Sequence, residues 1–569
     1  MTYNNFNASV YCPVGNIDSI DNLDKFDEQF KLLDNNVKIG KVYLETYRGG
    51  VFIDKDQMIK VKKYFNKKGI ITSSGITTED VSSADMGFSP FCYTSSRTRE
   101  KLKEIVTLTA ELFDEFILDD FYFTNCRCES CIKAKETRSW SEFRVDLMKE
   151  ISENVIVGTA KKVNPNVKVI IKYPNWYEHY QDAGYNLADG PQIFDYIYTG
   201  TETRNPTYTQ QHLPKYLSFF IMRYLEHVAS NRNLGGWFDP YECNYNLTSY
   251  LDQGYLTLFA KAKEAMLFSL GSLTNDPSYT TFPPAIGQVF ADVDKYFDKL
   301  GNPTGTACYI PFHSHGEDYL HNYIGMCGIP LDPYPNYPSE ATRIFLTKSA
   351  ACDKDIIEKI QKSLYQGNDV IVTSGFVEAL GEAFHEFMHV SYSSRKALIN
   401  RYAYSENGGV TYGGCVQSAK EIMIPQMEFF TNDVWELIGG LGEDNNFPLL
   451  LRTRYAQGRL YVLTIPDDYG DIYHYPRMII NAIREIFTDN PIVELNADSK
   501  VTLFTYDNDT FILRSFNPYI DRIKLTINKE NATLLDLERN KSYTGVTKQG
   551  KTIIELTIGP GVNFVLTIK

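Results

Sequence analysis

Short apolar runs alternate with amphipathic stretches from the N-terminus to about residue 275. The amphipathic stretches, such as 98–113 and 141–163, repeat apolar residues at intervals of three and four, which is the helical pattern. The short runs are rich in β-branched and aromatic residues, as buried strands are. They predict eight strands, at residues 8–13, 40–45, 69–73, 115–120, 167–173, 196–199, 236–239 and 265–269. Strand–helix units in this number and length of chain indicate an α/β fold, the parallel (β/α)8 or TIM barrel.

The remainder of the chain predicts two further domains. Beyond Pro303 the alternation resumes, with strands and helices expected at 305–310, 343–346, 354–365, 369–373, 459–465 and 475–487. These elements indicate a second α/β domain. From about residue 492, runs such as KVTLFTY and TIIELTI alternate between turns of Asn, Asp and Gly, which is typical of antiparallel strands. We therefore expect a barrel at 1–285, an α/β domain at 286–490 and a C-terminal β-sandwich at 491–569.

Composition narrows the class of partner. The 569 residues carry a formal net charge of −14, which argues against nucleic acid because phosphate binding needs cationic surface. No apolar run reaches the roughly 18 residues of a membrane span, and the N-terminal sequence lacks a charged segment followed by an apolar one. Ten cysteines are too few for a disulfide scaffold in a chain of this length. We expect a cytoplasmic protein with no membrane partner, unless a signal peptide has been removed.

One segment, FDEFILDDFYFTNCRCESC, joins two kinds of chemistry. Its apolar strand ends on Asp119 and Asp120, and a C-x-C-x-x-C motif of Cys126, Cys128 and Cys131 follows. Three thiolates at this spacing can wrap around a tetrahedral ion, and Cys92, in the loop after the third strand, is the natural fourth ligand. Four thiolates close the coordination sphere, so the sequence predicts a structural zinc that does not activate water, and no organic cofactor.

Carboxylates recur at the predicted C-terminal ends of the barrel strands, where such barrels place their active sites. Glycoside hydrolysis usually needs two carboxyl groups, one on each side of the scissile bond. The candidate catalytic acids are Asp119, Asp120, Glu202 and Asp239. Polar and aromatic candidates for binding the substrate lie at similar depths, namely Glu45, Arg48, Lys172, Trp176, Arg204 and Trp237. These residues predict a carbohydrate substrate.

Neighbouring residues in a strand point to opposite sides, so one residue of the Asp119–Asp120 pair faces the barrel axis while the other orients it. We favour Asp120 as the catalytic residue. Its partner is either Glu202, after the sixth strand, or Asp239, after the seventh.

The acids at the end of strand four, the C-x-C-x-x-C motif and the cysteine after strand three together resemble the family 42 glycoside hydrolases, the β-galactosidases, and their uncharacterised barrel relatives. The resemblance implies a glutamine-amidotransferase-like middle domain, a small β domain and a homo-oligomer, trimeric or dimeric. Two departures separate this chain from true members. Family 42 enzymes have an Asn-Glu pair where this chain has Asp119-Asp120, and a nucleophilic Glu where it has Asp239. The β-galactosidase specificity is therefore not carried over.

The predicted middle domain also differs from active glutamine amidotransferases. Active amidotransferases have a Cys nucleophile after a strand, whereas this chain has Ser374-Gly375, so we expect a structural domain that serves subunit contacts. In the barrel, a catalytic pair on strands four and six is similar to the retaining α-galactosidase-like clan. This similarity favours Asp120 with Glu202 and a retaining glycosidase for small oligosaccharides or glycosides.

Three alternatives stay open. A glycoside phosphorylase or transglycosidase would use the same architecture, and a non-catalytic barrel would bind sugar without turnover. The segment FHEFMHV contains His385-Glu386-x-x-His389, the zinc metallopeptidase pattern when it lies on a helix. An amphipathic helix with Phe384, Phe387 and Met388 on its buried side explains the same residues.

Overall fold

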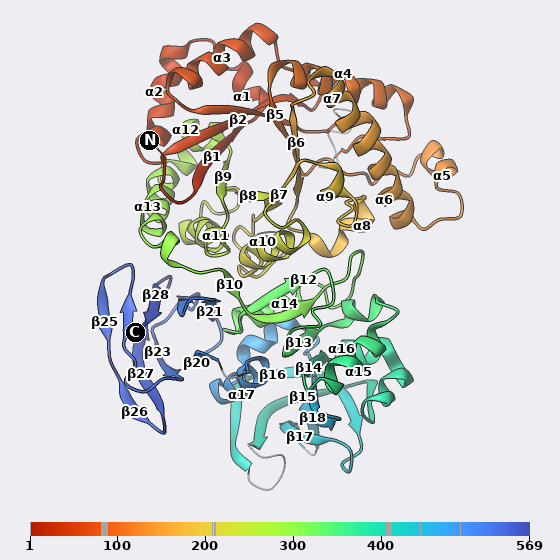
Figure 1. The fold of residues 1–569 in the computed structure, drawn as a ribbon, viewed down its shortest axis with the longest axis vertical. Helices are drawn as coiled ribbons and strands as arrows, with labels where there is room; N and C mark the ends of the chain where they lie inside the picture. The colour runs from red at the N-terminus through yellow and green to blue at the C-terminus, as the bar shows by residue number, and fades with distance from the viewer. Residues whose placement is uncertain are drawn as a thin grey trace. The chain divides into compact units, whose positions relative to one another are not determined.

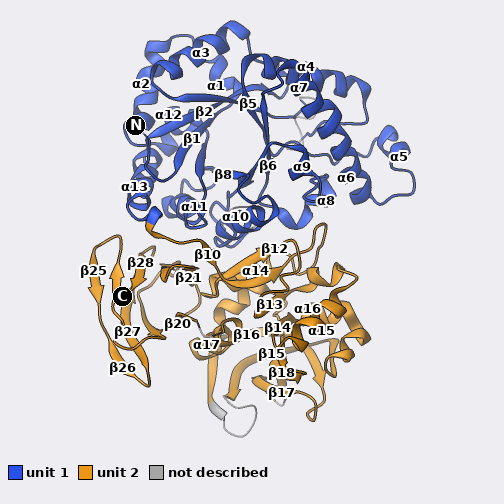
Figure 2. Ribbon diagram, viewed as in Figure 1, with its two compact units in different colours: residues 1–298 blue, residues 299–569 orange. Residues whose placement is uncertain are grey.

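The computed structural model describes residues 2–569 except 81–88, 208, 210, 211, 406–411, 444 and 490. It forms two compact units, 1–298 and 299–569 (Figure 2). The second unit contains both the predicted α/β domain and the predicted β-sandwich, and the boundary between these two stays a prediction. None of the described helices combines the length and the hydrophobicity that a membrane-spanning segment needs.

The first unit is the predicted (β/α)8 barrel. Its described strands pair in the order β1-β9-β8-β7-β6-β5-β4-β2, and a parallel β1–β2 pairing closes the ring. The barrel strands are β1 (Asn7–Cys12), β2 (Ile39–Arg48), β4 (Ile71–Ile76), β5 (Glu115–Leu118), β6 (Lys168–Tyr173), β7 (Tyr196–Gly200), β8 (Asn233–Phe238) and β9 (Glu264–Phe268). A short strand, β3 (Val51–Phe52), forms an antiparallel hairpin with β2. All eight predicted strands are confirmed, with ends that shift by a few residues.

Helices surround the barrel (Figure 1). The longer ones are α2 (Leu23–Asp34), α3 (Lys55–Lys67), α4 (Ser96–Leu112), α6 (Trp140–Ile151), α10 (Leu217–Val228), α11 (Leu247–Phe259) and α13 (Phe282–Asp294). Helix α6 begins at a capping box of Ser139 and Glu142, which satisfies backbone N–H groups that a helix start leaves unpaired. The single helix predicted over 141–163 is α6, a π-helical turn (Ser152–Val157) and α7 (Gly158–Val163) in succession.

The barrel interior is filled by inward-facing side chains of seven strands, Tyr11, Tyr43, Ile117, Ile170, Tyr198, Trp237 and Met266. The remaining barrel strand, β4, contributes Gly75, where a Cβ atom would lie 2.2 Å from the Tyr11 hydroxyl oxygen. Three of the seven side chains are tyrosines. Because a buried hydroxyl group needs a hydrogen-bond partner, this core also holds buried acceptors.

The second unit contains the predicted α/β domain and β domain. Its largest sheet has the order β12-β11-β13-β14-β19-β18-β17-β15-β16. The first five strands are parallel: β12 (Leu331–Tyr334), β11 (Thr306–Tyr309), β13 (Arg343–Leu346), β14 (Asp369–Thr373) and β19 (Gly458–Leu463). The helices α15 (Ile356–Tyr365) and α17 (Arg477–Phe487) match the predicted ones.

The antiparallel half of this sheet was not predicted. It consists of β15 (Val390–Ser405), β16 (Tyr412–Phe429), β17 (Trp435–Leu441) and β18 (Asn446–Tyr455). These strands are long and carry bulges in the β15–β16 pair, which break the strict alternation on which strand prediction depends.

Two antiparallel sheets follow, in the orders β10-β21-β22-β28-β24-β25 and β20-β23-β27-β26. Leu503 and Phe511 of the first sheet and Leu525 and Ile554 of the second share one hydrophobic core, so the sheets pack face to face as a sandwich. The contributing strands are β10 (Pro303–Thr304), β20 (Val493–Asn496), β21 (Val501–Tyr506), β22 (Thr510–Ser515), β23 (Asp521–Ile527), β24 (Leu534–Asp536), β25 (Lys541–Tyr543), β26 (Val546–Lys548), β27 (Lys551–Ile558) and β28 (Asn563–Ile568).

Candidate active site

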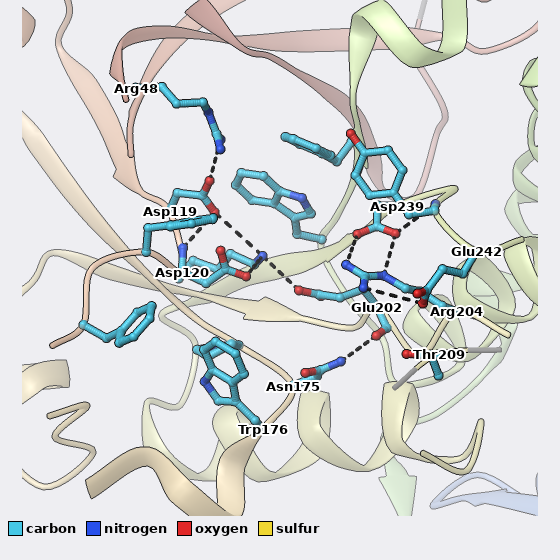
Figure 3. Close-up of a pocket in the computed structure, with 17 residues that line it drawn as sticks. Arg48, Asp119, Asp120, Asn175, Trp176, Glu202, Arg204, Thr209, Asp239 and Glu242 are labelled. Atoms are coloured by element: carbon cyan, nitrogen blue, oxygen red, sulfur yellow. Dashed lines mark hydrogen bonds and ion pairs between the residues drawn. The ribbon is translucent and has the colours of Figure 1, made fainter. Parts of the chain in front are cut away.

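A pocket of about 510 Å³ lies at the C-terminal ends of the barrel strands (Figure 3). Nine of the ten residues predicted for catalysis or substrate binding line it: Arg48, Asp119, Asp120, Lys172, Trp176, Glu202, Arg204, Trp237 and Asp239. These residues come from several different strands or the loops that follow them, so the barrel brings together side chains that are far apart in sequence.

Lys172, near the end of β6, joins the acids of two other strands. Its Nζ atom lies 2.7 Å from Oδ2 of Asp120 and 3.0 Å from Oε1 of Glu202. The side chain is 2 % exposed. Burial by itself would lower the pKa of Lys172, but the charges of Asp120, Glu202 and Asp119 outweigh burial and raise it. Lys172 is therefore an ammonium ion that orients both carboxylates.

Glu202 follows β7 and is 7 % exposed. While Oε1 accepts a hydrogen bond from Lys172, the buried Oε2 atom has no hydrogen-bond partner among the described residues. A Cβ atom at Gly200 would lie 2.8 Å from Oε2, so the glycine leaves room for this carboxylate. The side chain of Asn175 holds the backbone of Glu202 by donating a 2.5 Å hydrogen bond to its carbonyl oxygen.

Asp119 lies deeper than Asp120. It is 3 % exposed, and its Oδ2 atom accepts hydrogen bonds from Arg48 (2.8 Å) and Thr77 (3.0 Å). Its Oδ1 atom accepts the backbone N–H of Asp120 at 2.7 Å. Burial, followed by the nearby charge of Asp120, raises the pKa of Asp119 to about 6. Asp119 thus holds the backbone of Asp120 directly, and its Oδ1 atom lies 3.9 Å from Nζ of Lys172, the partner of the Asp120 side chain.

Glu45, which we predicted to bind substrate, is not a lining residue. It is fully buried, and its carboxylate accepts hydrogen bonds from Tyr11 (2.7 Å), Thr77 (2.5 Å) and the Val14 backbone N–H (2.8 Å). Both of its oxygens also lie within 3.1 Å of Nε of Arg48. Glu45 therefore orients Arg48 from beneath the pocket.

A second charged group lies opposite Lys172. Arg204 contacts Asp239 through two hydrogen bonds, Nε to Oδ1 at 3.0 Å and Nη2 to Oδ2 at 2.8 Å. Glu242, three residues after Asp239, also lines the pocket, and its Oε2 atom lies 3.8 Å from Nη1 of Arg204. The guanidinium group thus separates two carboxylates.

Aromatic rings form part of the pocket wall. Nζ of Lys172 lies 4.3 Å from the centre of the Trp237 ring, and Trp237 stacks on Phe268 at 5.7 Å. Trp176 packs edge-on against Phe123 at 5.8 Å. The lining residues Asn175, Phe123, Phe268 and Glu242 were not predicted. Glu242, close to Asp239 in the sequence, Phe268, at a strand end, and Asn175, two residues beyond β6 and next to Trp176, carry a signal that could have identified them.

The four predicted zinc ligands meet in one cluster. The potential ligand atoms of Cys92, Cys126, Cys128 and Cys131 all lie within 4.8 Å of one another. The Sγ atoms of Cys92, Cys128 and Cys131 are 3.6–3.7 Å apart, too long for a disulfide bond of about 2.05 Å. Sulfur atoms on a tetrahedral zinc with Zn–S distances of about 2.3 Å are roughly 3.8 Å apart. The residues therefore fit a zinc ion.

The histidine motif of the second unit has a different geometry. Residues Gly381–Glu386 form a 3-10 helix, and His389 lies beyond its end, so the motif does not occupy one α-helix as predicted. Phe384, Phe387 and Met388 are buried, as expected. His389 lies 3.3 Å from Asp433 rather than in a ligand cluster. Across the described residues, the group of three or more metal-binding side chains that can share an ion is the cysteine cluster.

Comparisons with known proteins agree with this architecture. The model of the family described as "Probable glycosyl hydrolase, catalytic domain" matches residues 1–287. The chain belongs to this family. Two further models match, "Uncharacterized protein SSO3021, second domain" at 301–468 and "Probable glycosyl hydrolase, C-terminal domain" at 492–569. The protein is thus a glycosyl hydrolase whose barrel carries the active site.

Individual relatives of this glycosyl hydrolase share its length and architecture. The uncharacterized protein SSO3021 of Saccharolobus solfataricus is 25% identical over 502 residues, covering 81% of this chain and 83% of the relative. The α-L-fucosidase isoenzyme 2 of Paenibacillus thiaminolyticus has a similar structure, with a TM-score of 0.68 and 12% identity over 100% of both chains. A β-galactosidase from Bacillus circulans sp. alkalophilus has a TM-score of 0.64 and 12% identity, covering 99% of this chain and 98% of that one. At these identities the two enzymes share the fold.

Proposed function

We propose that this glycosyl hydrolase is a retaining glycosidase, with Asp120 as nucleophile and Glu202 as general acid and base. The observation that carries the proposal is the ammonium group of Lys172, which contacts one oxygen of each carboxylate. The substrates are small oligosaccharides or simple glycosides that fit a pocket of about 510 Å³.

The separation of the two acids supports retention. Since Oδ2 of Asp120 and Oε1 of Glu202 contact the same nitrogen, at 2.7 and 3.0 Å, these two oxygens lie at most about 6 Å apart, an upper limit that includes the separation of retaining enzymes. Retaining enzymes place their carboxyl groups about 5–5.5 Å apart, whereas inverting enzymes need about 6.5–9.5 Å to admit a water molecule. The alternative partner, Asp239, binds Arg204 through both of its oxygens, whereas Oε2 of Glu202 has no partner among the described residues.

The contacts suggest a role for each group in the reaction. Lys172 orients the carboxylate of Asp120 through a 2.7 Å contact, so that it can attack the anomeric carbon. The proton that Glu202 delivers to the leaving oxygen can reside on Oε2, because Oε1 already accepts from Lys172. Glu202 is a carboxylate once it has given up this proton, and Lys172 holds it in place while it removes a proton from the attacking water.

The charges of the pocket favour neutral sugars. Arg48, Lys172 and Arg204 face five lining carboxylates, and each cation contacts at least one of them. A substrate carboxylate or inorganic phosphate would have to displace one of these contacts. Hydrolysis is therefore favoured over phosphorolysis. The similar solved structures are named for a galactosidase and a fucosidase, which both act on neutral sugars.

We also propose that zinc occupies the cysteine cluster, in a structural role. Cys126, Cys128 and Cys131 follow β5 and the acids Asp119 and Asp120 that come directly after it, while Cys92 precedes α4. A closed site of four thiolates would hold these two loops together. The free state of all ten cysteines suits a reducing, cytoplasmic compartment, and the resemblance to family 42 favours a homo-oligomer.

The first experiment is hydrolysis of 4-nitrophenyl α- and β-glycosides of galactose, fucose, mannose and glucose, with Asp120→Asn as a parallel variant. We expect turnover of at least one glycoside by the wild type and its loss in the variant. Proton NMR of the first product then shows which anomer forms. An inverted anomer would exclude the retaining mechanism, phosphate-dependent turnover would indicate a phosphorylase, and sugar binding without turnover would indicate a non-catalytic barrel.

A further inference from the structure

Two charged groups at one side of the pocket face each other without a direct hydrogen bond. Nη1 of Arg204 and Oε2 of Glu242 are 3.8 Å apart, beyond hydrogen-bonding distance (Figure 3). The Oε2 atom is buried and has no hydrogen-bond partner among the described residues. The other two nitrogens of the Arg204 guanidinium group donate to Asp239, whereas Nη1 makes no hydrogen bond within the described part of the chain. One donor and one acceptor are thus left facing a common gap.

The backbone indicates that this arrangement is imposed by its surroundings. Arg204 has φ = 53° and Glu242 has φ = 57°, in the left-handed region that favours glycine. Residues other than glycine are held there when the structure around them fixes the position, and such residues cluster at functional sites. Here both members of one contact are held in this conformation, and both line the pocket.

Asp239 fixes the arginine in this orientation. Its two oxygens take up two sides of the guanidinium group, while the backbone N–H of Tyr241 donates to Oδ1 at 3.1 Å. The side chain of Gln253 donates to the carbonyl oxygen of Asp239 at 3.0 Å. Nη1 therefore points to the Glu242 side of the pocket.

We propose that Arg204 and Glu242 form a recognition pair for one hydroxyl group of the substrate sugar, in which Nη1 of Arg204 donates to the hydroxyl oxygen and Oε2 of Glu242 accepts its proton. This assignment rests on the proposed glycosidase function and adds a residue that determines specificity. The Glu242 side chain as a whole is 36 % exposed, so a rotation of its carboxylate on substrate binding would bring Oε2 to the pocket surface. A hydroxyl oxygen beside the line between the two atoms can then lie about 2.7–3.0 Å from both.

The chemistry of the pair selects a hydroxyl over other groups. A hydroxyl group can donate and accept at the same time, as this gap requires. An ammonium group has no acceptor and would face the positive charge of Arg204, while a carboxylate or phosphate would face the negative charge of Glu242. Since both partners are charged, the hydrogen bonds are stronger than those between neutral groups.

The test compares Glu242→Ala with the wild type on matched substrates. The probes are the 4-nitrophenyl glycoside that the wild type hydrolyses fastest in the panel above and its monodeoxy analogues. On the parent glycoside we expect Glu242→Ala to lower kcat/KM by about 10- to 150-fold. On one monodeoxy analogue the two proteins should agree within about 2-fold, because the hydroxyl group is absent from both sides of the comparison. Glu242→Gln keeps an acceptor oxygen and should recover part of the loss.

A matched control is available on the same barrel. Glu136 is another glutamate at positive φ (54°), but it is exposed, at the C-terminal end of α5 (Glu129–Lys135), and does not line the pocket. Glu136→Gln should leave every substrate ratio unchanged. Melting temperatures identify a misfolded variant, and Glu242→Gln then carries the test.

The recognition pair is excluded if Glu242→Ala loses the same factor on every monodeoxy analogue as on the parent, which would mean that the gap holds only water. Failure of the glycosidase proposal has a different signature. If the wild type hydrolyses no glycoside in the panel, calorimetric binding of methyl galactoside, fucoside, mannoside and glucoside to wild type and Glu242→Ala decides. An unchanged Kd for every sugar would then exclude the pair independently.

Discussion

The two ends of the barrel interior each hold a buried glutamate beside tyrosine hydroxyl groups, but they use it differently. At the N-terminal end, Oε1 of Glu264 accepts hydrogen bonds from Ser9 (2.9 Å), Tyr43 (3.0 Å) and Tyr198 (3.0 Å). Burial, and then the charge of Glu264, raises the pKa of both tyrosines well above the usual range, so they stay neutral donors. At the C-terminal end, Glu45 accepts from Tyr11 but also contacts the Arg48 cation.

The partners of the two glutamates indicate that Glu264, at the N-terminal end of the barrel, stabilises the fold, whereas Glu45, at the C-terminal end, serves the active site. Neutral donors from three strands surround the lower carboxylate, which gives a network inside the barrel. At the C-terminal end, Glu45 contacts Arg48, and Arg48 in turn contacts Asp119, which lines the pocket. In that pocket, oxygens of Glu202 and Glu242 lack protein partners among the described residues. Unmet hydrogen-bonding capacity next to a cavity indicates where substrate belongs.

The largest expected effect on activity comes from a substitution at the C-terminal end of the barrel. Asp120→Asn should lower kcat by at least about 10³-fold, because an amide cannot form the covalent intermediate. The melting temperature should change little, since Lys172 still contacts Glu202. Steady-state kinetics and calorimetry measure both quantities. A variant that keeps a tenth of the wild-type kcat would remove Asp120 from the reaction.

Loss of the zinc ion should lower the stability of the loops that carry Cys92 and residues 126–131 more than it lowers the catalytic activity. We expect purified protein to contain one zinc ion per chain, and Cys128→Ser to lose it with a drop in melting temperature of at least about 5 °C. Cys352→Ser is the control, because Cys352 is an exposed thiol outside the cluster. Elemental analysis by mass spectrometry tests the metal content, and zinc-free wild-type protein with an unchanged melting temperature would contradict the prediction.

At the N-terminal end of the barrel, a substitution should lower the stability of the fold and leave the activity nearly unchanged. Glu264→Ala leaves buried hydroxyl groups of Tyr43 and Tyr198 without their acceptor, at a cost of about 1–3 kcal/mol in the free energy of unfolding. The value of kcat/KM should stay within about 2-fold, since Glu264 does not line the pocket. Urea unfolding and steady-state kinetics on one preparation test both. A loss of activity without a loss of stability would break the division between the two ends.

The smallest effect is a pH dependence. Above about pH 6 Asp119 is ionised and binds Arg48, whereas below that pH it takes up a proton and the ion pair weakens. We therefore expect kcat/KM to fall as the pH drops through about 6. The same proton should stabilise the fold: the pKa is higher in the folded than in the unfolded chain, so folded protein binds it first between about pH 6 and 4.

The comparison with Asp119→Asn isolates this group. The variant carries no titratable group at this position, so its pH profile of kcat/KM should lack the limb near pH 6. If the limb persists in the variant, another carboxylate is responsible for it.

The sequence alone was enough for much of the fold. Buried parallel strands are continuous apolar runs between amphipathic helices, so all eight barrel strands and the strands β13 and β14 of the second unit were predictable. The bulged antiparallel strands β15 and β16 were not, because their register changes along the pair. The histidine pattern suggested a helix, whereas the packing of Phe384 and Phe387 in the core accompanies a 3-10 turn.

For the site, the sequence determined which acids end the strands, because strand ends and motif spacing are local properties. It could not decide the roles of Glu45 and Glu242, which depend on distances between strands that are far apart in the chain. Only the closed barrel places Arg48 beside Asp119, Lys172 between Asp120 and Glu202, and Glu242 opposite Arg204. These contacts follow from strand order and tilt, and no single segment of the chain encodes them.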